Sequence, residues 1–252
     1  MDRLKGKIAL VTGVGRKNGI GAAICRELAK NGADVFFTYW HQYDAENYSE
    51  TKDENPADFA EELKQFGGRV ACAEIDLYKS ESPADLFKIV VKKLGVPDIL
   101  INNAAVSMHV PFKEITSEML DQHFAVNVRA TGLLCQEFVK AWNKNTQGNI
   151  INMTSGQSLG VMRDELPYTI TKASVEMLTK QMAPEFALQG ITINALDPGP
   201  TDTGWMTDEL KEQIKRESKE GRINMPEDTA QLVVSMLSDA SGKTGQVIHA
   251  GR

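Results

Sequence analysis

Short apolar runs alternate along the whole chain with stretches whose apolar residues have helical spacing. Seven runs, rich in β-branched residues, are candidates for strands: residues 8–11, 33–39, 70–75, 98–102, 149–153, 192–196 and 246–249. Their nearly continuous apolar character is typical of parallel strands that helices cover on both faces. After the first run, Ile20, Ile24 and Leu28 recur at helical spacing. The alternation predicts an α/β fold, a doubly wound Rossmann-type domain built on a seven-stranded parallel sheet.

The organisation of the chain is simple. Its 252 residues contain no internal repeat and no low-complexity linker, so we expect one domain spanning residues 1–252. One segment, residues 40–56, is polar and acidic and follows the second predicted strand. We interpret it as an inserted surface loop rather than a domain boundary.

Cysteine, histidine and charge content narrow the class of protein. Cys25, Cys72 and Cys135 form no CxxC pair, which favours free thiols in a reducing compartment. The four histidines lack metal-ligand spacing, so we expect no metal. A net charge of −6 argues against a nucleic-acid partner, and the sequence shows neither a secretory signal nor a membrane-spanning apolar run. We therefore expect a cytoplasmic protein with no nucleic-acid or membrane partner.

A glycine-rich segment follows the first predicted strand. Thr12-Gly13 is separated by five residues from Gly19-Ile20-Gly21, which opens the predicted helix. Glycine lets the backbone turn sharply and approach a pyrophosphate, whose charge a helix N-terminus favours. The segment predicts a dinucleotide site; the alternative is an ordinary turn that binds nothing.

The end of the second predicted strand bears on the choice of cofactor. Sites for NAD(H) usually carry an acidic residue there, which binds the ribose 2′-hydroxyl. Here the strand ends in Tyr39 and Trp40 without an acid, and the glycine loop holds Arg16 and Lys17. These cations favour a 2′-phosphate, so we predict NADP(H) rather than NAD(H). The alternative is that both are solvated surface cations.

A tyrosine and a lysine have the spacing of an acid/base pair. Tyr168 and Lys172 are four residues apart and so share one face of a helix. A neighbouring ammonium lowers the pKa of a phenol, which can then exchange a proton with a carbonyl oxygen. A second pair of this spacing, Tyr48 and Lys52, lies in the acidic segment without a matching serine upstream. Ser155 follows the fifth predicted strand, 13 residues before Tyr168, which places it at the carboxyl edge of the sheet.

With these motifs in order, the chain resembles the short-chain dehydrogenase/reductase family over essentially its whole length. The resemblance rests on Thr12-Gly13 with Gly19-x-Gly21, Asp76-Leu77, Asn102-Asn103-Ala104-Ala105, Asn127, Ser155, Tyr168-x-x-x-Lys172, residues 197–203 and Thr244-Gly245-Gln246. Each motif alone is weak, whereas their joint order is specific.

The resemblance implies four catalytic roles. Tyr168 resembles the general acid/base, and Ser155 the donor that polarises the substrate carbonyl. Lys172 resembles the residue that binds the nicotinamide ribose and lowers the pKa of Tyr168, and Asn127 the residue that links a proton-relay water to Lys172. Local capping roles are the alternatives for Asn127 and Ser155.

The resemblance also implies the cofactor contacts. Asp76 and Leu77 resemble the adenine contacts, although Asp76 has the alternative of a turn residue. Because the glycine loop is longer than the family's usual one, the amides that touch phosphate stay open. The full predicted set is Gly13, Arg16, Lys17, Gly19, Ile20, Asp76, Leu77, Asn103, Ala104, Ala105, Tyr168, Lys172 and a nicotinamide clamp of Pro198, Gly199, Thr201 and Thr203.

The substrate end is expected between a floor at residues 156–167 and a lid at residues 204–222. Trp205, Met206 and Met162 either contact an acyl chain or simply pack the lid. The overall pattern most resembles 3-oxoacyl-(acyl-carrier-protein) reductases; enoyl reductases are disfavoured because their tyrosine–lysine spacing is wider.

The resulting prediction is an oxidoreductase that transfers hydride between NADP(H) and a small-molecule carbonyl or secondary alcohol, with an acyl-carrier-bound 3-oxoacyl thioester among the candidates. By analogy with the family we expect a homotetramer or homodimer. The alternative is a catalytically silent NADP(H)-binding regulatory protein.

Overall fold

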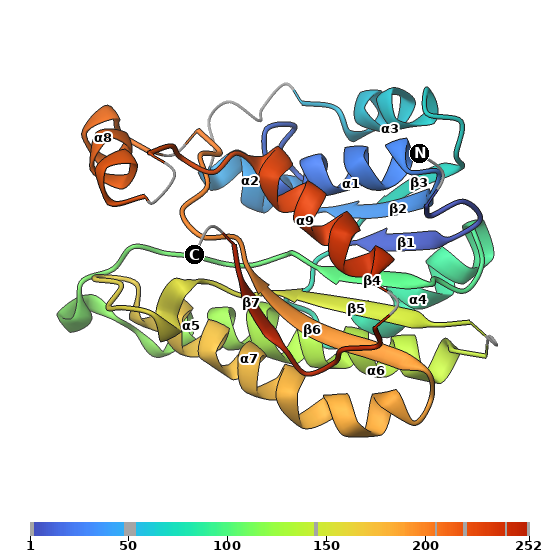
Figure 1. Cartoon of the computed structure of the whole chain (residues 1–252). Helices are drawn as coiled ribbons and strands as arrows, with labels where there is room; N and C mark the ends of the chain where they lie inside the picture. The colour runs from blue at the N-terminus through green and yellow to red at the C-terminus, as the bar shows by residue number, and fades with distance from the viewer. Residues whose placement is uncertain are drawn as a thin grey trace.

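The computed structural model describes residues 3–47, 54–143, 146–204, 206–218, 221–239 and 241–250. They build a sheet with helices on both faces (Figure 1). The strands are β1 (Ile8–Val11), β2 (Asp34–Tyr39), β3 (Val70–Glu74), β4 (Ile99–Asn102), β5 (Gly148–Met153), β6 (Ile191–Asp197) and β7 (Val247–His249). The helices are α1 (Ile20–Lys30), α2 (His41–Asn47), α3 (Pro56–Lys64), α4 (Ser82–Lys93), α5 (Ser117–His123), α6 (Thr131–Ala141), α7 (Leu166–Ala187), α8 (Asp208–Glu217) and α9 (Pro226–Ser238), with the short η2 (Phe112–Glu114) and η4 (Gly156–Ser158) and the π-helical η3 (Phe124–Ala130).

The sheet has the strand order of a doubly wound fold. All seven strands run parallel in the order β3-β2-β1-β4-β5-β6-β7. The predicted fold class is confirmed, and every predicted strand end lies within one residue of the observed one. The order reverses between β1 and β4, and ligands of open α/β sheets bind at such a switch point, outside the carboxyl ends of the strands.

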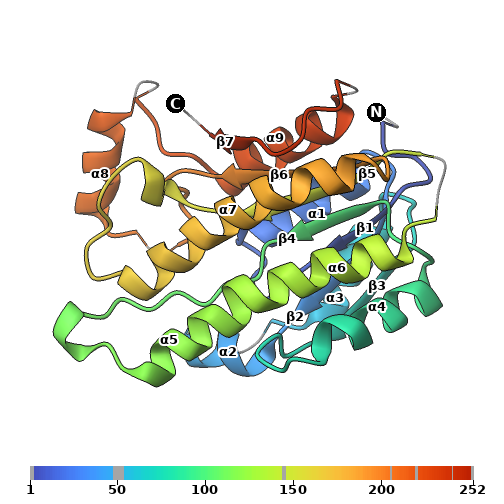
Figure 2. The ribbon, with the colours of Figure 1, turned by 90° about the horizontal axis from the view of Figure 1, so that it is seen from below.

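Alternate residues of each strand face two different cores. In β1, Ala9 and Val11 pack in the core that includes α1, α3 and α9, whereas Ile8 and Leu10 pack in the core that includes α4, α6 and α7. Figure 2 shows α4, α6 and α7 lying across the second face of the sheet. Because successive side chains point to opposite faces, a strand covered on both faces must be apolar throughout.

Proline sets the start of several helices. It occupies the first or second position of α3, α4, α7 and α9, where its fixed φ suits the helix and its missing N–H costs nothing. Within the described ranges, none of the helices combines the length and the apolar character needed to cross a membrane.

The acidic segment after β2 differs from its prediction as a surface loop. Residues 41–47 form α2, and α3 begins at Pro56, where Asn55 Oδ1 accepts a hydrogen bond from the Ala57 amide at 3.0 Å. The pair Tyr48 and Lys52 lies outside the described residues. The sequence gives little sign of α2 because its seven residues include none that is fully buried, so it lacks an apolar stripe.

Candidate active site

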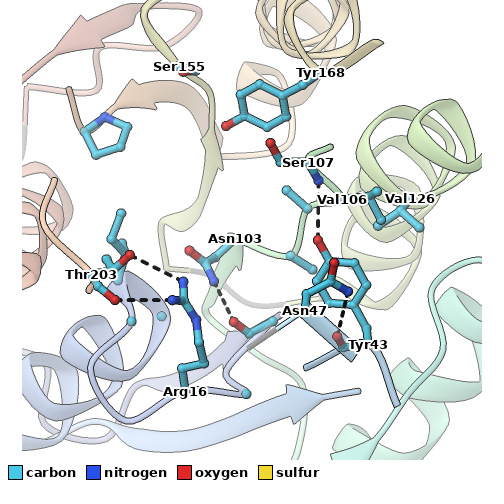
Figure 3. A pocket seen from close by; sticks show the side chains of 18 of the residues that line it. Arg16, Tyr43, Asn47, Asn103, Val106, Ser107, Val126, Ser155, Tyr168 and Thr203 are labelled. Atoms are coloured by element: carbon cyan, nitrogen blue, oxygen red, sulfur yellow. Dashed lines mark hydrogen bonds between the residues drawn. The ribbon is translucent and has the colours of Figure 1, made fainter. Parts of the chain in front are cut away.

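A cavity of about 780 Å³ opens at the carboxyl edge of the sheet (Figure 3). Its walls come from the loops after β1, β3, β4, β5 and β6 and from α2. The predicted residues that line it are Gly13, Arg16, Gly19, Ile20, Asp76, Leu77, Asn103, Ala104, Ala105, Ser155, Tyr168, Pro198, Gly199, Thr201 and Thr203. Lys17, Asn127 and Lys172 lie outside this lining. The volume falls within the usual range for cofactor and ligand sites.

The structure brings Ser155, Tyr168 and Lys172 together where β5 ends and α7 begins. Ser155 Oγ lies 3.9 Å from Met162 Sδ and near enough to the Tyr168 phenol to lower the pKa of that phenol. Lys172 Nζ lies 5.5 Å from the centre of the Tyr168 ring and donates a hydrogen bond to the Met153 carbonyl at 2.8 Å. Lys172 is only 3% exposed, so its ammonium is fixed below the cavity floor rather than free in solvent.

The pKa of the Tyr168 phenol is raised above its ordinary value, mainly because the side chain is buried. The nearby Ser155 hydroxyl lowers this pKa, and three groups that become negative on ionisation raise it: Glu165, Asp197 and the Tyr43 phenol. Burial also lowers the pKa of Lys172 to about 8. The predicted net lowering of the Tyr168 pKa is therefore wrong for this arrangement, because desolvation of the phenolate outweighs the effect of the Lys172 ammonium, which donates its hydrogen bond to a backbone carbonyl.

Asn127 joins the loop after β4 to α7. It lies in η3 and is 1% exposed. Its Oδ1 accepts a hydrogen bond from the Val106 amide at 2.8 Å, and its Nδ2 donates to the Val106 carbonyl and to Thr171 Oγ1, both at 2.9 Å. Because Thr171 adjoins Lys172, Asn127 ties one wall of the cavity to the helix that carries the tyrosine and lysine. Its predicted role beside a relay water stays a prediction.

The start of the glycine loop is fastened to the end of β4. Gly13 has a φ of +72°, and a Cβ at this position would lie 2.5 Å from Ala104 Cα. Thr12 Oγ1 accepts hydrogen bonds from the Asn103 and Ala104 amides at 3.1 Å. Asn103 Nδ2 donates to the carbonyls of Thr12 and Gly13 at 2.9 Å. The result is a bare backbone surface that a pyrophosphate can approach closely.

An acidic side chain lies against the same loop. A Cβ on Gly15 would be 1.7 Å from Asp44 Oδ2, so the Asp44 carboxylate of α2 sits directly over the Gly15 backbone. Burial raises the pKa of Asp44 to about 6, Arg16 and His41 lower it, and Glu54 raises it. Strand β2 ends without an acidic residue. Helix α2, in the insertion after β2, nevertheless places the Asp44 carboxylate against the glycine loop, a contact that the sequence did not reveal.

Of the two predicted cations, only Arg16 reaches the cavity. Its guanidinium crosses to Thr203, where Nη1 donates to the carbonyl at 3.3 Å and Nη2 to Oγ1 at 3.4 Å (Figure 3). Asn18 Nδ2 donates to the same carbonyl at 3.2 Å. The structure does not bring Lys17 to the main cavity: its backbone amide donates to the Glu54 carboxylate at 2.9 Å, behind the loop.

The predicted nicotinamide clamp is held by the end of β6. Asp197 Oδ1 accepts a hydrogen bond from the Gly199 amide at 2.8 Å, and Asp197 Oδ2 lies 2.9 Å from His249 Nδ1. Thr201 Oγ1 donates to the Gly199 carbonyl at 3.1 Å. At the adenine end, Asp76 Oδ1 accepts from the Tyr78 amide at 2.9 Å, which is the turn bond proposed as its alternative role.

The substrate end has two walls of different character. Leu159, Val161 and Met162 come from the predicted floor, and Ser107 and His109 from the loop after β4. Of the described residues beyond Thr203, none lines the cavity. Predicted contact Met206 is 6% exposed, and Trp205 lies outside the described residues. Helix α8 stands at this edge (Figure 1), tied to the clamp by Lys211 Nζ and Asp202 Oδ2 at 2.8 Å.

Several lining residues were not named individually by sequence reasoning; Glu165 lies within the predicted floor at residues 156–167, whereas Tyr43, Asp44 and His109 lie outside every predicted set. Tyr43 and Asp44 come from α2, and Tyr43 Oη accepts a hydrogen bond from the Ser107 amide at 3.4 Å (Figure 3). His109 and Glu165 flank the substrate end. Glu165 precedes Tyr168 by three residues, a helical spacing that marks it as a neighbour. No comparable signal exists for the two residues of α2.

Comparison with known proteins gives full-length similarity. The family model described as Enoyl-(Acyl carrier protein) reductase matches residues 13–251. The uncharacterized oxidoreductase YjdA of Bacillus subtilis is 40% identical, with 99% of this chain and 97% of the relative covered. A 3-oxoacyl-(acyl-carrier-protein) reductase of Aquifex aeolicus is 32% identical, with 98% and 96% covered.

Solved structures give the same picture. A short-chain dehydrogenase/reductase from Serratia marcescens has a TM-score of 0.85 at 31% identity, over 98% of this chain and 97% of that one. The angucycline C-6 ketoreductase LanV, solved with bound NADP, has a TM-score of 0.85 at 30% identity, over 98% and 95% of the two chains.

Proposed function

The chain belongs to the short-chain dehydrogenase/reductase family of oxidoreductases, and from that premise we propose that it transfers hydride between NADP(H) and a ketone or secondary alcohol. The observation that carries the proposal is the grouping of Ser155, Tyr168 and Lys172 at the end of a cavity that begins at the glycine loop.

Tyr168 is the proposed proton donor. Its raised pKa keeps the phenol protonated near neutral pH, which suits donation to a carbonyl oxygen as that oxygen gains negative charge. Ser155 holds the phenol and supplies a second hydroxyl for the same oxygen. Lys172 contributes a fixed positive charge beneath the ring, and such a charge favours the phenolate left after proton transfer.

The chain's own geometry fits a nicotinamide dinucleotide. Gly13 leaves open backbone where a side chain would collide with Ala104, and the start of α1 points amides at the same place, as pyrophosphate binding requires. When bound, the cofactor supplies or accepts the hydride. The loop cation Arg16, which lines the cavity, and the NADP bound to the similar LanV support NADP(H) over NAD(H). The Asp44 carboxylate and the hydrogen bonds that hold the Arg16 guanidinium at Thr203 oppose it, so the affinities for both cofactors are to be measured.

The substrate class follows from the mechanism and the relatives. A donor phenol and a serine hydroxyl serve a C=O bond, and the similar Aquifex aeolicus protein is a 3-oxoacyl-(acyl-carrier-protein) reductase. We therefore place 3-oxoacyl thioesters among the candidate ketones. The matching family model is described as an enoyl reductase, so an enoyl thioester is the necessary comparison substrate.

The proposal also covers the substrate lid, the cellular compartment and the oligomeric state. Residues 204–222, which include α8, would cover the bound substrate and exclude water. The separate free thiols of Cys25, Cys72 and Cys135 suit the cytoplasm. Exposed Phe124 and Met177 offer apolar surface for a homodimer or homotetramer.

The decisive test is Tyr168→Phe. Wild-type protein should oxidise NADPH in the presence of ketones, among them the acetoacetyl thioester of N-acetylcysteamine, and should leave the matching crotonyl thioester unreduced. The variant should lose about a hundredfold to ten-thousandfold in kcat, because it lacks the donor proton, while its Kd for NADPH stays close to wild type. Wild-type activity in the variant contradicts the mechanism, and NADPH binding without turnover in the wild type favours the silent regulator instead.

A further inference from the structure

The substrate end of the cavity contains a carboxylate that the proposed proton transfer does not use. Glu165 lines the cavity at the first turn of α7, three residues before Tyr168. Its side chain is 17% exposed and lies 3.4 Å from His109 Nε2, which is 67% exposed. Burial raises the pKa of Glu165, and His109 lowers it. A half-buried acid beside a reaction centre needs a physical reason, because burying a carboxylate costs free energy.

Helix capping does not supply that reason. Glu165 is the N-cap residue of α7, yet its side chain makes no capping hydrogen bond, and glutamate is not a favoured N-cap residue. The Glu165 carboxylate instead lies beside His109, and both residues line the cavity that Tyr168 also lines.

The surroundings hold this carboxylate in place. The Val110 amide donates to the Asp164 carbonyl at 2.7 Å, which joins the loop after β4 to the loop before α7 next to both members of the pair. Asp164 has a φ of +57°, an uncommon backbone state that persists where neighbouring structure over-determines it. Glu165 and His109 are therefore presented on fixed backbone, as a recognition site requires.

We infer that Glu165, with His109 beside it, is a specificity-determining residue that accepts a hydrogen bond from a hydroxyl carried by the ketone substrate close to its carbonyl. The inference rests on the proposed function and narrows it. An ionised carboxylate only accepts hydrogen bonds, so its natural ligand here is a donor. Leu159, Val161 and Met162, the apolar part of the lining, would receive the hydrocarbon part of the same molecule.

A carboxylate at this position discriminates strongly between substrates with and without the hydroxyl. A ligand that lacks the hydroxyl covers the half-buried Glu165 carboxylate and leaves it only the exposed His109 as a partner, and the cost of a charged group that loses its contact with water exceeds the gain from one apolar contact. The site therefore favours hydroxyketones over ketones whose flanking chain is wholly alkyl. That preference separates polyhydroxylated or hydroxylated carbonyl compounds from saturated acyl chains.

The test uses two pairs of ketones in which a hydroxyl replaces a methyl group: hydroxyacetone against butanone, and diacetone alcohol against methyl neopentyl ketone. Each is assayed with NADPH and NADH for wild type, Glu165→Gln and Glu185→Gln. Glu185 is an exposed residue of the same helix, outside the cavity lining, and so controls for loss of one negative charge from α7. Where reduction is slow, the same comparison is made in reverse with propylene glycol and sec-butanol.

For the hydroxylated member of at least one pair, kcat/KM of Glu165→Gln should fall about tenfold to a hundredfold, while kcat/KM for the alkyl partner changes less than about threefold. Glu185→Gln should match wild type on all four ketones. An equal effect on both members of each pair overturns the inference, because removal of the Glu165 charge would then act only through the acidity of Tyr168. No effect on either member overturns it as well. Wild-type activity on the acetoacetyl thioester with none on these compounds in either direction overturns the inference alone, whereas absence of activity on the thioester as well contradicts the proposed function itself.

Discussion

The two ends of the cavity are built in different ways. At the catalytic end, Ser155, Tyr168 and Lys172 come from one strand–loop–helix segment and are tied by buried hydrogen bonds such as that from Lys172 Nζ to the Met153 carbonyl. At the adenosine end, the glycine loop meets α2, a helix from the insertion after β2, and Asp44 lies against Gly15. Hydrogen bonds within one strand–loop–helix segment, with Asn127 joining it to the loop after β4, fix the first end. Contacts of the glycine loop with the end of β4 and with α2 fix the second.

The difference shows which contacts of a site can be predicted from the spacing of residues in the sequence. A four-residue spacing on a helix determines which side chains share a face, so this spacing together with a serine upstream singled out Tyr168 and Lys172. The approach of α2 to the glycine loop depends on the course of a segment without apolar periodicity. If this comparison is correct, substitutions at the catalytic end should lower both the free energy of unfolding and kcat. Substitutions at the adenosine end should change the relative affinity for NADPH and NADH.

Asn127→Ala should have the largest effect on the fold. It orphans the amide and carbonyl of Val106 and removes one of the two hydrogen bonds of the Thr171 hydroxyl, which still donates to the Tyr168 carbonyl. The free energy of unfolding should fall by roughly 2 to 6 kcal/mol. Urea denaturation measures this, with Gln136→Ala on the exposed surface of α6 as the control; that change should stay within about 0.5 kcal/mol. A loss as small as the control's would mean that the catalytic end is less tightly built than the adenosine end.

Gly13→Ala should come next, because the start of the glycine loop is the rigid part of the adenosine end. The left-handed φ and the contact with Ala104 together should cost about 2 to 5 kcal/mol of unfolding free energy, and NADPH affinity should fall. Gly67→Ala is the matched control: its φ is +91° but nothing lies within 4 Å, so it should cost only about 1 to 2 kcal/mol. Equal losses in the two variants would show that close approach to Ala104 contributes nothing.

Asp44→Asn should have the smallest and most selective effect. Near pH 8 the ionised carboxylate opposes a 2′-phosphate by about 1 kcal/mol, so the variant should bind NADPH about fivefold more tightly while its affinity for NADH changes little. The pKa of Asp44 is about 6, so near pH 5 the wild-type side chain is mostly protonated and the difference should shrink. Glu46→Gln, an exposed residue of the same helix, is the control. An unchanged ratio of NADPH to NADH affinity would remove Asp44 from cofactor selection.

Asp44→Asn should also change how the free energy of unfolding depends on pH. Because the folded pKa of Asp44 is raised above 3.8, its protonation stabilises the folded state below the unfolded pKa, and this contribution is lost as pH rises through about 6. Arg16 and His41 offset part of that loss, and Glu54 adds to it. Relative to wild type, Asp44→Asn should therefore gain stability as pH increases from about 4 to about 7.

Much of the fold and site was predictable from particular residues. The runs that became β1 to β7 are apolar throughout, and the spacing of Tyr168 and Lys172 placed them together. The predicted direction of the Tyr168 pKa shift was wrong, because that direction depends on burial of the phenol and on the hydrogen bond that Lys172 donates to the Met153 carbonyl. The prediction that Lys17 reaches the cavity was not met, because the sequence does not determine whether a side chain of this long glycine loop faces the cavity or the opposite side.

The sequence by itself determined the order of strands and helices along the chain, the identity of the family and the grouping of Ser155, Tyr168 and Lys172, because periodicity and short spacings act along the chain. Only the tertiary structure decided which group faces which across the cavity: Asp44 over Gly15, Arg16 toward Thr203, and Glu165 beside His109. Those pairings join residues that are far apart in sequence, and their distances and desolvation exist only once the whole sheet edge has formed.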